Sequence, residues 1–218
     1  MLRLLFEKTG NGMWISHLDL MRVFQRAFRR AGLALRHTEG YNPHAFVSIV
    51  LPLSVGASSQ CEILEFELSE PSDLAALPQR LNKALPDGIH CLSAWEGLKK
   101  TRELTYLQAR VTLEYDRGVP GGAVEAMTAL LAREALVVEK RSKKGDVELD
   151  IRPMLKEALV RQMDENTIEI EAVVCAQNPS LNPALLVGAV RRYLPEMAPD
   201  FSLVHRLEVY DGQMAPFR

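Results

Sequence analysis

The chain has 218 residues, of which 47% are hydrophobic and 25% charged, with a formal net charge of −2. These proportions are typical of a globular protein with a sizeable core, organised as one large or two small domains. No apolar run approaches the roughly 18 residues of a membrane-spanning helix, so we expect no membrane partner. Cys61, Cys91 and Cys175 lie far apart without a CxxC pair, which predicts a reducing, cytoplasmic location and no thiolate metal site.

The charges are unevenly distributed along the chain. Residues 1–60 contain seven Lys and Arg against three Asp and Glu, a local net charge of +4, whereas the remainder carries 19 against 25, or −6. The overall balance gives no global attraction for nucleic acid, but the sequence predicts a basic N-terminal surface on an acidic body.

The first half has the pattern of a small α+β domain. Apolar residues alternate in segments that predict strands, and leucines recur at helical spacing after Ser72 and Asp73, which we expect to cap a helix containing Leu74, Leu77, Leu81 and Leu85. With a helix between Ser16 and Gly32, the predicted order is strand, helix, two strands, helix, strand. The predicted strands cover residues 2–7, 34–38, 45–53, 63–68 and 89–95, of which 34–38 is a short addition to that order.

The second half repeats this order in outline. We expect helices at residues 124–131 and from Pro183 onward, a short helical turn at 153–157, and strands at 109–115, 135–140, 147–151, 158–162, 167–174 and 203–210. The fold class is therefore predicted as α+β, with two ferredoxin-like (βαββαβ) halves packed side by side. The halves are residues 1–96 and 108–218, connected by 97–107.

The helix that begins after Ser16 separates an apolar side from a basic side. Ser16 is expected to cap its N-terminus, Asp19 suits its first turn, and Gly32 ends it. The apolar side contains His17, Leu20, Met21, Phe24, Ala27, Phe28 and Ala31. The basic side contains Arg22, Arg26, Arg29 and Arg30. These arginines are interpreted either as a solvated face or as a stripe that binds anions, since a guanidinium group pairs with phosphate in bidentate geometry.

The segment His37–His44 predicts an ordered loop between two strands. Gly40 permits positive φ, while Pro43 fixes its own φ and restricts the residue before it. The candidate binding side chains here are His37, Tyr41, Asn42 and His44, because ordered loops on a rigid scaffold often carry binding residues. The alternative is that each histidine has a structural role or is simply exposed.

A second basic segment lies in the C-terminal half. It comprises Lys140, Arg141, Lys143 and Lys144, and it is interpreted either as the solvated tip of a hairpin or as a contact to a phosphate backbone. Just beyond it, Asp150 is expected to cap the next turn, and Arg152 is expected to pair with a carboxylate.

The common catalytic motifs do not occur. We find no GxGxxG, Walker, HExxH, GxSxG or CxxxCxxC pattern. His17, His37, His44 and Cys61 match no common zinc spacing, so neither a metal nor another cofactor is expected. A polar site of His17 and Asp19 with the loop residues His37, Tyr41, Asn42 and His44 remains an alternative, belonging to a small-molecule enzyme or a metal-dependent maturation factor.

Several segments resemble the bacterial radical-SAM-linked family, which carries domain of unknown function 2344. The resemblance covers nearly the whole chain and is strongest in SHLDLMR and GYNPH. The segments are RLLFEKTG (3–10), WISHLDLMRVFQRAFRRAGL (14–33), EGYNPHAFVSIVLPLSVG (39–56), CEILEFEL (61–68) and VELDIRP (147–153). The resemblance implies a radical SAM partner encoded nearby in the bacterial cytoplasm, and an RNA context. Ala45 and Phe46 stand where the family commonly has Pro-Lys, which removes a cation beside the loop.

The leading hypothesis is a non-catalytic accessory module that binds RNA, such as tRNA or rRNA, for a radical SAM protein. The arginines would hold phosphates and Tyr41 would stack on an unpaired base. A protein-binding scaffold that docks through an apolar surface is a third alternative. The leading hypothesis requires the first helix and the loop after it to form one positively charged recess.

Overall fold

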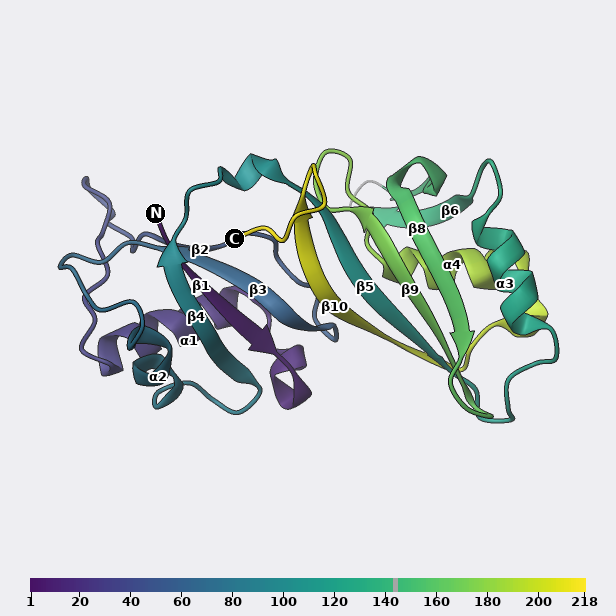
Figure 1. Cartoon of the computed structure of the whole chain (residues 1–218), viewed down its shortest axis with the longest axis horizontal. Helices are drawn as coiled ribbons and strands as arrows, with labels where there is room; N and C mark the ends of the chain where they lie inside the picture. Colours follow the sequence, from purple (N-terminus) through teal and green to yellow (C-terminus); the bar gives the residue numbers. More distant parts are fainter. Residues whose placement is uncertain (143–144) are drawn as a thin grey trace. The chain divides into compact units, whose positions relative to one another are not determined.

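The computed structural model describes residues 1–142 and 145–218, which form two compact units (Figure 1). Unit 1 comprises residues 1–101 with Arg218, and unit 2 comprises residues 102–217. The division falls within residues 97–107, the segment predicted to connect two halves. Lys143 and Lys144 of the second basic segment lie outside the described residues. Each unit combines helices with antiparallel strands, so the α+β class is confirmed.

Unit 1 contains two helices and an antiparallel sheet. Three of its strands are ordered β4-β1-β3. The short strand β2 lies outside this order and pairs with β3. Leu4 pairs with Leu64 on one side and with Ala94 on the other, which places β1 inside the sheet. In chain order the elements are β1 (Leu2–Lys8), a 3-10 helix (Gly10–Trp14), α1 (His17–Arg30), β2 (Val47–Ile49), β3 (Ser58–Phe66), α2 (Leu77–Asn82) and β4 (Ile89–Glu96).

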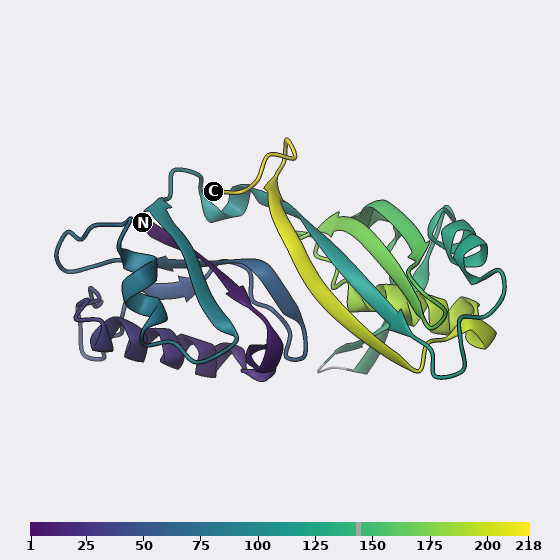
Figure 2. The same cartoon turned by 60° about the horizontal axis from the view of Figure 1, so that its bottom comes forward.

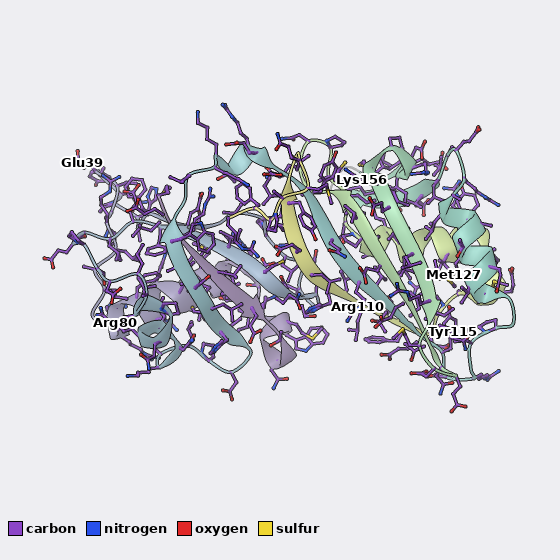
Figure 3. The ribbon with its side chains drawn as sticks, in the orientation of Figure 1. Glu39, Arg80, Arg110, Tyr115, Met127 and Lys156 are labelled. Atoms are coloured by element: carbon purple, nitrogen blue, oxygen red, sulfur yellow. The ribbon has the colours of Figure 1, made fainter. Side chains whose placement is uncertain are left out.

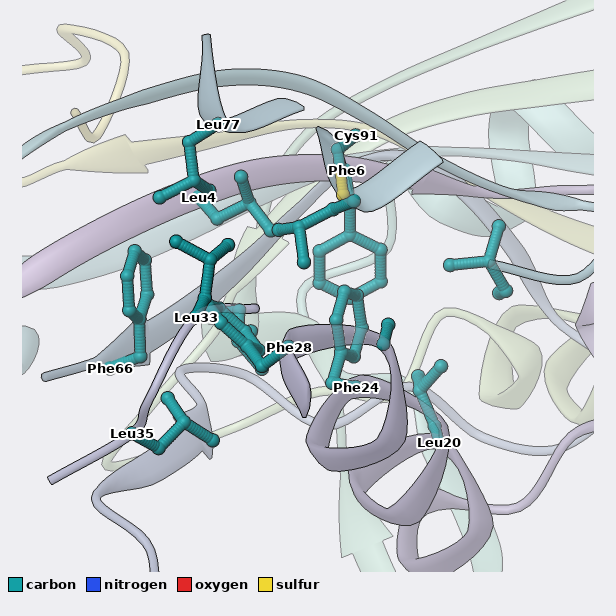
Figure 4. Packing of buried hydrophobic residues seen from close by; sticks show 14 of the residues in the cluster. Leu4, Phe6, Leu20, Phe24, Phe28, Leu33, Leu35, Phe66, Leu77 and Cys91 are labelled. Atoms are coloured by element: carbon teal, nitrogen blue, oxygen red, sulfur yellow. The ribbon is translucent and has the colours of Figure 1, made fainter. Parts of the chain in front are cut away.

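The core of unit 1 lies between its sheet and its helices. Phe24 and Phe28 project from α1 toward the strands (Figure 4), where their rings lie 4.7 Å from Phe6 and 5.0 Å from Phe66. Leu77 of α2 belongs to the same buried cluster, so both helices cover one face of the sheet. Figure 2 shows α1 along this face. Burial of the phenylalanines fixes the rotation of α1, and therefore decides which of its residues face outward.

The described residues of unit 2 form the neighbouring strands β10-β5-β9-β8, paired antiparallel, together with the hairpin β6-β7 and the helices α3 and α4. In Figure 1, α4 crosses behind β8 and β9. In chain order the elements are a 3-10 helix at the unit boundary (Thr101–Glu103), β5 (Leu104–Glu114), α3 (Ala123–Leu131), β6 (Val137–Ser142), β7 (Gly145–Asp150), a 3-10 helix (Arg152–Met154), β8 (Leu155–Gln162), β9 (Thr167–Cys175), α4 (Ala184–Tyr193), a 3-10 helix (Pro195–Met197) and β10 (Phe201–Asp211).

Some predicted boundaries in unit 1 were wrong. The strand expected at residues 45–53 is only the three-residue β2, and the segment 34–38 forms isolated bridges at Leu35 and His37. Helix α2 begins at Leu77 rather than after Asp73. The Asp73 carboxylate instead accepts a 2.9 Å hydrogen bond from the Ala75 amide, which stabilises a turn before the helix.

The junction after β7 shows one expected and one unexpected feature. Asp150 accepts hydrogen bonds from the amides of Leu136 and Arg152, at 2.8 and 3.0 Å. The second bond satisfies the first amide of the next 3-10 helix, as expected for Asp150, although the N-cap position itself is Ile151. These two bonds hold the pKa of Asp150 below its usual value. Arg152 was predicted to pair with a carboxylate, and its guanidinium instead donates hydrogen bonds to the carbonyl oxygens of Arg133 and Leu155, at 3.0 and 2.7 Å. Its positive charge still contributes to the lowered pKa of the Asp150 carboxylate.

Within residues 1–142 and 145–218, none of the helices combines the length and the apolar character needed to cross a bilayer.

Candidate functional site

Helix α1 is capped as its sequence predicts. The Ser16 hydroxyl accepts a 3.2 Å hydrogen bond from the Asp19 amide and donates one of 2.7 Å to the Asp19 carboxylate. At the other end, Gly32 has φ +67°, a left-handed conformation that glycine adopts without the strain of a Cβ atom. The helix therefore begins and ends at defined residues, and its outward-facing side chains hold defined positions.

The arginines of α1 are all exposed, but their surroundings differ. Arg22 pairs with Asp19 at 2.9 Å. Within the described part of the chain, Arg26, Arg29 and Arg30 form no ion pair. Successive helical residues point about 100° apart, so Arg29 and Arg30 face different sides of the last turn. The predicted stripe is therefore divided between neighbouring surfaces.

The segment after α1 forms a short hairpin over residues 36–46. The amide of Phe46 donates to the Arg36 carbonyl at 2.8 Å, and the amide of Thr38 donates to the His44 carbonyl at 2.9 Å. Gly40 at the tip has φ +124°, and Figure 3 shows the neighbouring Glu39 at the outer end of the loop. The sequence prediction of an ordered loop is confirmed by these bonds.

Arg36, at the base of the hairpin, has a structural role. Its guanidinium pairs with Glu67 of the segment after β3 and lies 4.4 Å from the centre of the Phe46 ring. Both contacts stabilise the hairpin against the rest of unit 1. Among the described residues, Arg36 is therefore paired, unlike Arg26, Arg29 and Arg30 of α1.

Two histidines of the hairpin have matching hydrogen bonds. His37 Nδ1 lies 2.9 Å from the Leu35 carbonyl oxygen, and His44 Nδ1 lies 3.2 Å from the Asn42 carbonyl oxygen. A carbonyl oxygen only accepts, so the Nδ1 of His37 carries the hydrogen, and its Nε2 is the atom that can contact a ligand. The Nδ1 of His44 also lies 3.4 Å from the Thr38 hydroxyl, which can donate or accept, so either nitrogen of this ring can carry the hydrogen.

A recess of about 740 Å³ lies between the C-terminal half of α1 and this hairpin, and we call it the first recess. Its volume is in the range of small-molecule sites, roughly 300–1,000 Å³. One part of its wall is apolar, another part is Arg29 with the two histidines, and no carboxylate lines it. The lining residues are Gln25, Phe28, Arg29, Gly32, Leu33, Ala34, Leu35, His37, Pro43, His44 and Ala45.

The structure brings together some of the predicted site residues. Arg29, His37 and His44 line the first recess. Tyr41 and Asn42 are exposed on the loop beside it but do not line it. Arg22 and Arg26 are also outside the lining, and Arg30 borders a second recess near α2.

His17 and Asp19 belong to the opposite end of α1. Twelve residues separate His17 from Arg29, which corresponds to about 18 Å along a helix. His17 Nδ1 is buried and has no hydrogen-bond partner among the described residues. Asp19 is exposed, and its hydrogen bonds with Ser16 and Arg22 hold its pKa below the usual value. The structure therefore does not gather the predicted polar site into one place.

Sequence reasoning missed two groups of lining residues. Gln25 precedes Arg29 by one helical turn, and this i, i+4 spacing was a usable signal. Phe28 was assigned to the core, where it lies, but it also lines the first recess. Arg80 and Lys83 of the second recess come from α2, about 50 residues after α1, and no local pattern connects them with it.

The side chains that could bind a metal ion do not cluster in the described residues. Over residues 1–142 and 145–218, no cluster of three or more His, Cys, Asp or Glu side chains is placed to hold an ion. Cys91 lies in the core, where burial raises the pKa of its thiol to about 12.

Comparison with known proteins identifies the family. A family model described as "Uncharacterized protein conserved in bacteria (DUF2344)" matches residues 1–183. The chain belongs to this family. The match covers all of α1, the hairpin and the first recess, and it confirms the family resemblance of the sequence motifs. The description of the family assigns no function, and the link to a radical SAM protein stays a prediction.

The other two comparisons add no functional name. No curated protein matches this chain. Among solved structures, the chain is similar to an unknown protein from Galdieria sulphuraria, and the match covers 94% of this chain and 96% of that one. The sequence identity is 15% and the TM-score is 0.26, a likeness too weak to inform either fold or function.

Proposed function

We propose that this protein is a non-catalytic accessory module that binds single-stranded RNA at the first recess and presents it to a radical SAM protein. One observation carries the RNA part of the proposal. Arg29, His37 and His44 line the same recess as Phe28 and Leu33, with no carboxylate among the lining residues. A cationic wall beside an apolar wall suits a nucleotide, which has an anionic phosphate and a flat base.

The residues of the first recess have distinct proposed roles. Arg29 binds a phosphate, because no carboxylate of the described chain competes for its guanidinium group. The Nε2 atoms of His37 and His44 form hydrogen bonds with the phosphate or with a base edge. Tyr41, fully exposed at the tip of the loop, stacks on a neighbouring unpaired base.

The radical SAM partner is proposed from the resemblance of the SHLDLMR and GYNPH segments to the radical-SAM-linked family. The same resemblance supports tRNA or rRNA as the class of RNA. A cytoplasmic location is part of the proposal, since the three cysteines are unpaired. Crosslinking in the native host, followed by purification of this protein, tests it. A radical SAM protein and RNA recovered together support the proposal, and recovery of neither contradicts it.

We also propose that both units are variants of the ferredoxin-like arrangement. When the strands of unit 1 are numbered in chain order, its sheet has the order 4-1-3, with the second strand paired to the third. When β6 and β7 are left out of the numbering, the strands β10-β5-β9-β8 of unit 2 have the order 4-1-3-2. Antiparallel pairing throughout supports this interpretation, with the β6-β7 hairpin as an insertion between α3 and β8.

Binding of a short fluorescent oligoribonucleotide tests the proposed RNA site directly. Electrostatic binding requires the affinity to fall steeply with salt concentration. The Arg26→Ala, Arg29→Ala double variant should bind all oligoribonucleotide sequences more weakly. A matched control is Arg117→Ala with Arg191→Ala, since both are exposed cations of unit 2 and Arg191 occupies the last turn of α4 as Arg29 does in α1. Equal affinities for the two double variants would contradict the proposal.

A second candidate function is a small-molecule or metal-dependent enzyme or maturation factor. The observation in its favour is that two histidines in a recess of about 740 Å³ both have Nδ1 within hydrogen-bond distance of a carbonyl oxygen, as is usual for histidines that bind metals through Nε2. Elemental analysis of the purified protein tests the metal version. Stoichiometric metal that is lost in His37→Ala would favour it over the RNA proposal.

A further inference from the structure

A second recess of about 440 Å³ lies between the C-terminal ends of α1 and α2, and we call it the second recess. Its polar lining consists of three cations, Arg30, Arg80 and Lys83, and no carboxylate is among the lining residues. The other lining residues are Ala31, Ala84 and Leu85. Such a lining attracts anions and excludes cations.

Arg80 is held in place by contacts to other segments. Its Nη2 donates to the Ala31 carbonyl oxygen at 2.7 Å, and its Nη1 lies 3.4 Å from the Ser72 hydroxyl. Figure 3 shows Arg80 in the α2 region of unit 1. A guanidinium group has five N–H donors, so further donors remain for a ligand after these two contacts. The side chain therefore needs little additional ordering to bind an anion.

The C-terminal ends of α1 and α2 favour nearby cations, and two of the three cations still have no ion-pair partner among the described residues. The C-terminal end of a helix carries a partial negative charge that nearby cations offset. Arg80 already neutralises the last carbonyl region of α1 through its bond to Ala31. Arg30 and Lys83 are exposed beside it, and within the described residues neither has an ion-pair partner.

The two recesses lie next to each other across one turn of the chain. Arg29 and Gly32 line the first recess, whereas Arg30 and Ala31 between them line the second. A Cβ atom on Gly32 would lie 3.9 Å from Arg80 Nη2, so this glycine is close to both sites. A ligand that crosses the Arg29–Gly32 turn can therefore contact both recesses.

We propose that Arg30, Arg80 and Lys83 bind backbone phosphates of the same RNA strand that occupies the first recess. This inference rests on the proposed function and extends it, because it gives the direction in which the strand leaves the first recess, toward α2. The second recess then contributes affinity without reading sequence, since phosphate contacts are the same for every base.

The test measures how the affinity for a short single-stranded oligoribonucleotide depends on salt concentration. For single strands, each phosphate contact contributes about −0.7 to the slope of log affinity against log salt. Removing two contacts with Arg30→Ala and Lys83→Ala should therefore make the slope less negative by about 1.4. Arg80 is kept because it also caps α1. The Arg117→Ala, Arg191→Ala control should keep the wild-type slope, and thermal melting establishes that each variant is folded.

The outcomes separate this inference from the proposed function. A wild-type slope in the Arg30→Ala, Lys83→Ala variant would overturn the proposal that the second recess binds phosphates. Weaker binding by Arg29→Ala would in that case still support RNA binding at the first recess. Absence of RNA binding by the wild-type protein overturns both. Should the double variant fail to fold, Lys83→Gln alone changes one exposed side chain and should make the slope less negative by about 0.7. An unchanged slope in Lys83→Gln then overturns the inference.

Discussion

Both ends of helix α1 carry exposed arginines, but only the arginine at the N-terminal end pairs with a carboxylate in the described residues. At the N-terminal end, Ser16, Asp19 and Arg22 bond to one another, within a span of seven residues. At the C-terminal end, Arg29 and Arg30 have no carboxylate partner in the described chain, and each borders a different recess. The N-terminal network is complete by itself, whereas the C-terminal end leaves charge available to another molecule.

This contrast shows that the number of arginines on a helix does not define a binding surface. Arg22 and Arg29 are both exposed residues of α1, and both lie on the side predicted to bind anions. Only Arg29 lies beside a recess formed with a second segment, the 36–46 hairpin. Availability of a charge depends on its local acidic neighbours and on the surface that tertiary packing creates around it.

The largest expected effect comes from the phenylalanines that hold α1 against the sheet. Phe24→Ala and Phe28→Ala should each lower the free energy of unfolding by about 3–5 kcal/mol, because both side chains are fully buried. Of the two, only Phe28 lies directly behind the wall of the first recess, so only Phe28→Ala should also change the shape of that wall and weaken RNA binding by the folded protein. Urea unfolding and fluorescence anisotropy measure the two effects. Identical loss of RNA affinity in both variants would argue against a role for the recess.

The next effect compares the arginines at the two ends of α1. Arg29→Ala should weaken RNA binding about tenfold or more, which corresponds to loss of a charged hydrogen bond of roughly 1.5–3 kcal/mol. Arg22→Ala should change the affinity by less than about twofold, since Arg22 already pairs with Asp19. Titration of each variant with the same oligoribonucleotide at fixed salt provides the measurement. An equal loss of RNA affinity in Arg22→Ala and Arg29→Ala would contradict the proposed difference between the two ends of α1.

A smaller effect is expected at the helix N-cap. Ser16→Ala should lower the free energy of unfolding by about 1 kcal/mol, because the Asp19 amide loses its hydrogen-bond acceptor. RNA affinity should stay at the wild-type value, since the N-terminal end does not line either recess. Thermal unfolding and RNA titration together check the prediction. Weaker RNA binding in this variant, measured well below its melting temperature, would contradict it.

The smallest effect concerns the pH dependence of Asp19. Its pKa in the folded protein is lowered, first by the Ser16 hydrogen bond and then by Arg22. The ionised carboxylate therefore stabilises the fold at pH values above the unfolded pKa of about 3.9. This stabilisation is lost as the pH falls through the lower folded pKa. The stability difference between wild type and Asp19→Asn should shrink in that acidic range, which urea unfolding at several pH values can show. A difference that grows on acidification would refute this account.

Local sequence patterns predicted the features of unit 1 that depend on neighbouring residues. Ser16 and Gly32 marked the ends of α1 because capping acts within a few residues. The spacing of Phe24 and Phe28 predicted the buried side of the helix for the same reason. Gly40 indicated the tip of the hairpin through its backbone freedom.

Features that depend on distant residues were not predictable in this way. The choice of Arg29 rather than Arg22 for the first recess follows from where the 36–46 hairpin folds back against α1. The meeting of Arg30 with Arg80 and Lys83 requires α2 to pack beside α1, which spacing along the chain does not encode. The strand predicted at 45–53 is shorter because its ladder with β3 covers Val47–Ile49 and ends with the bond from the Val50 amide to the Ile63 carbonyl. Pro52 has no amide hydrogen with which to continue the ladder.

The most direct test of the RNA site is an NMR titration of isotope-labelled protein with a short single-stranded oligoribonucleotide. The account predicts that backbone amide shifts concentrate at residues 28–46, which surround the first recess and include the loop with Tyr41, with little change at residues 16–22. Shifts confined to residues 16–22, or no shifts in unit 1 at saturating oligoribonucleotide, would contradict it.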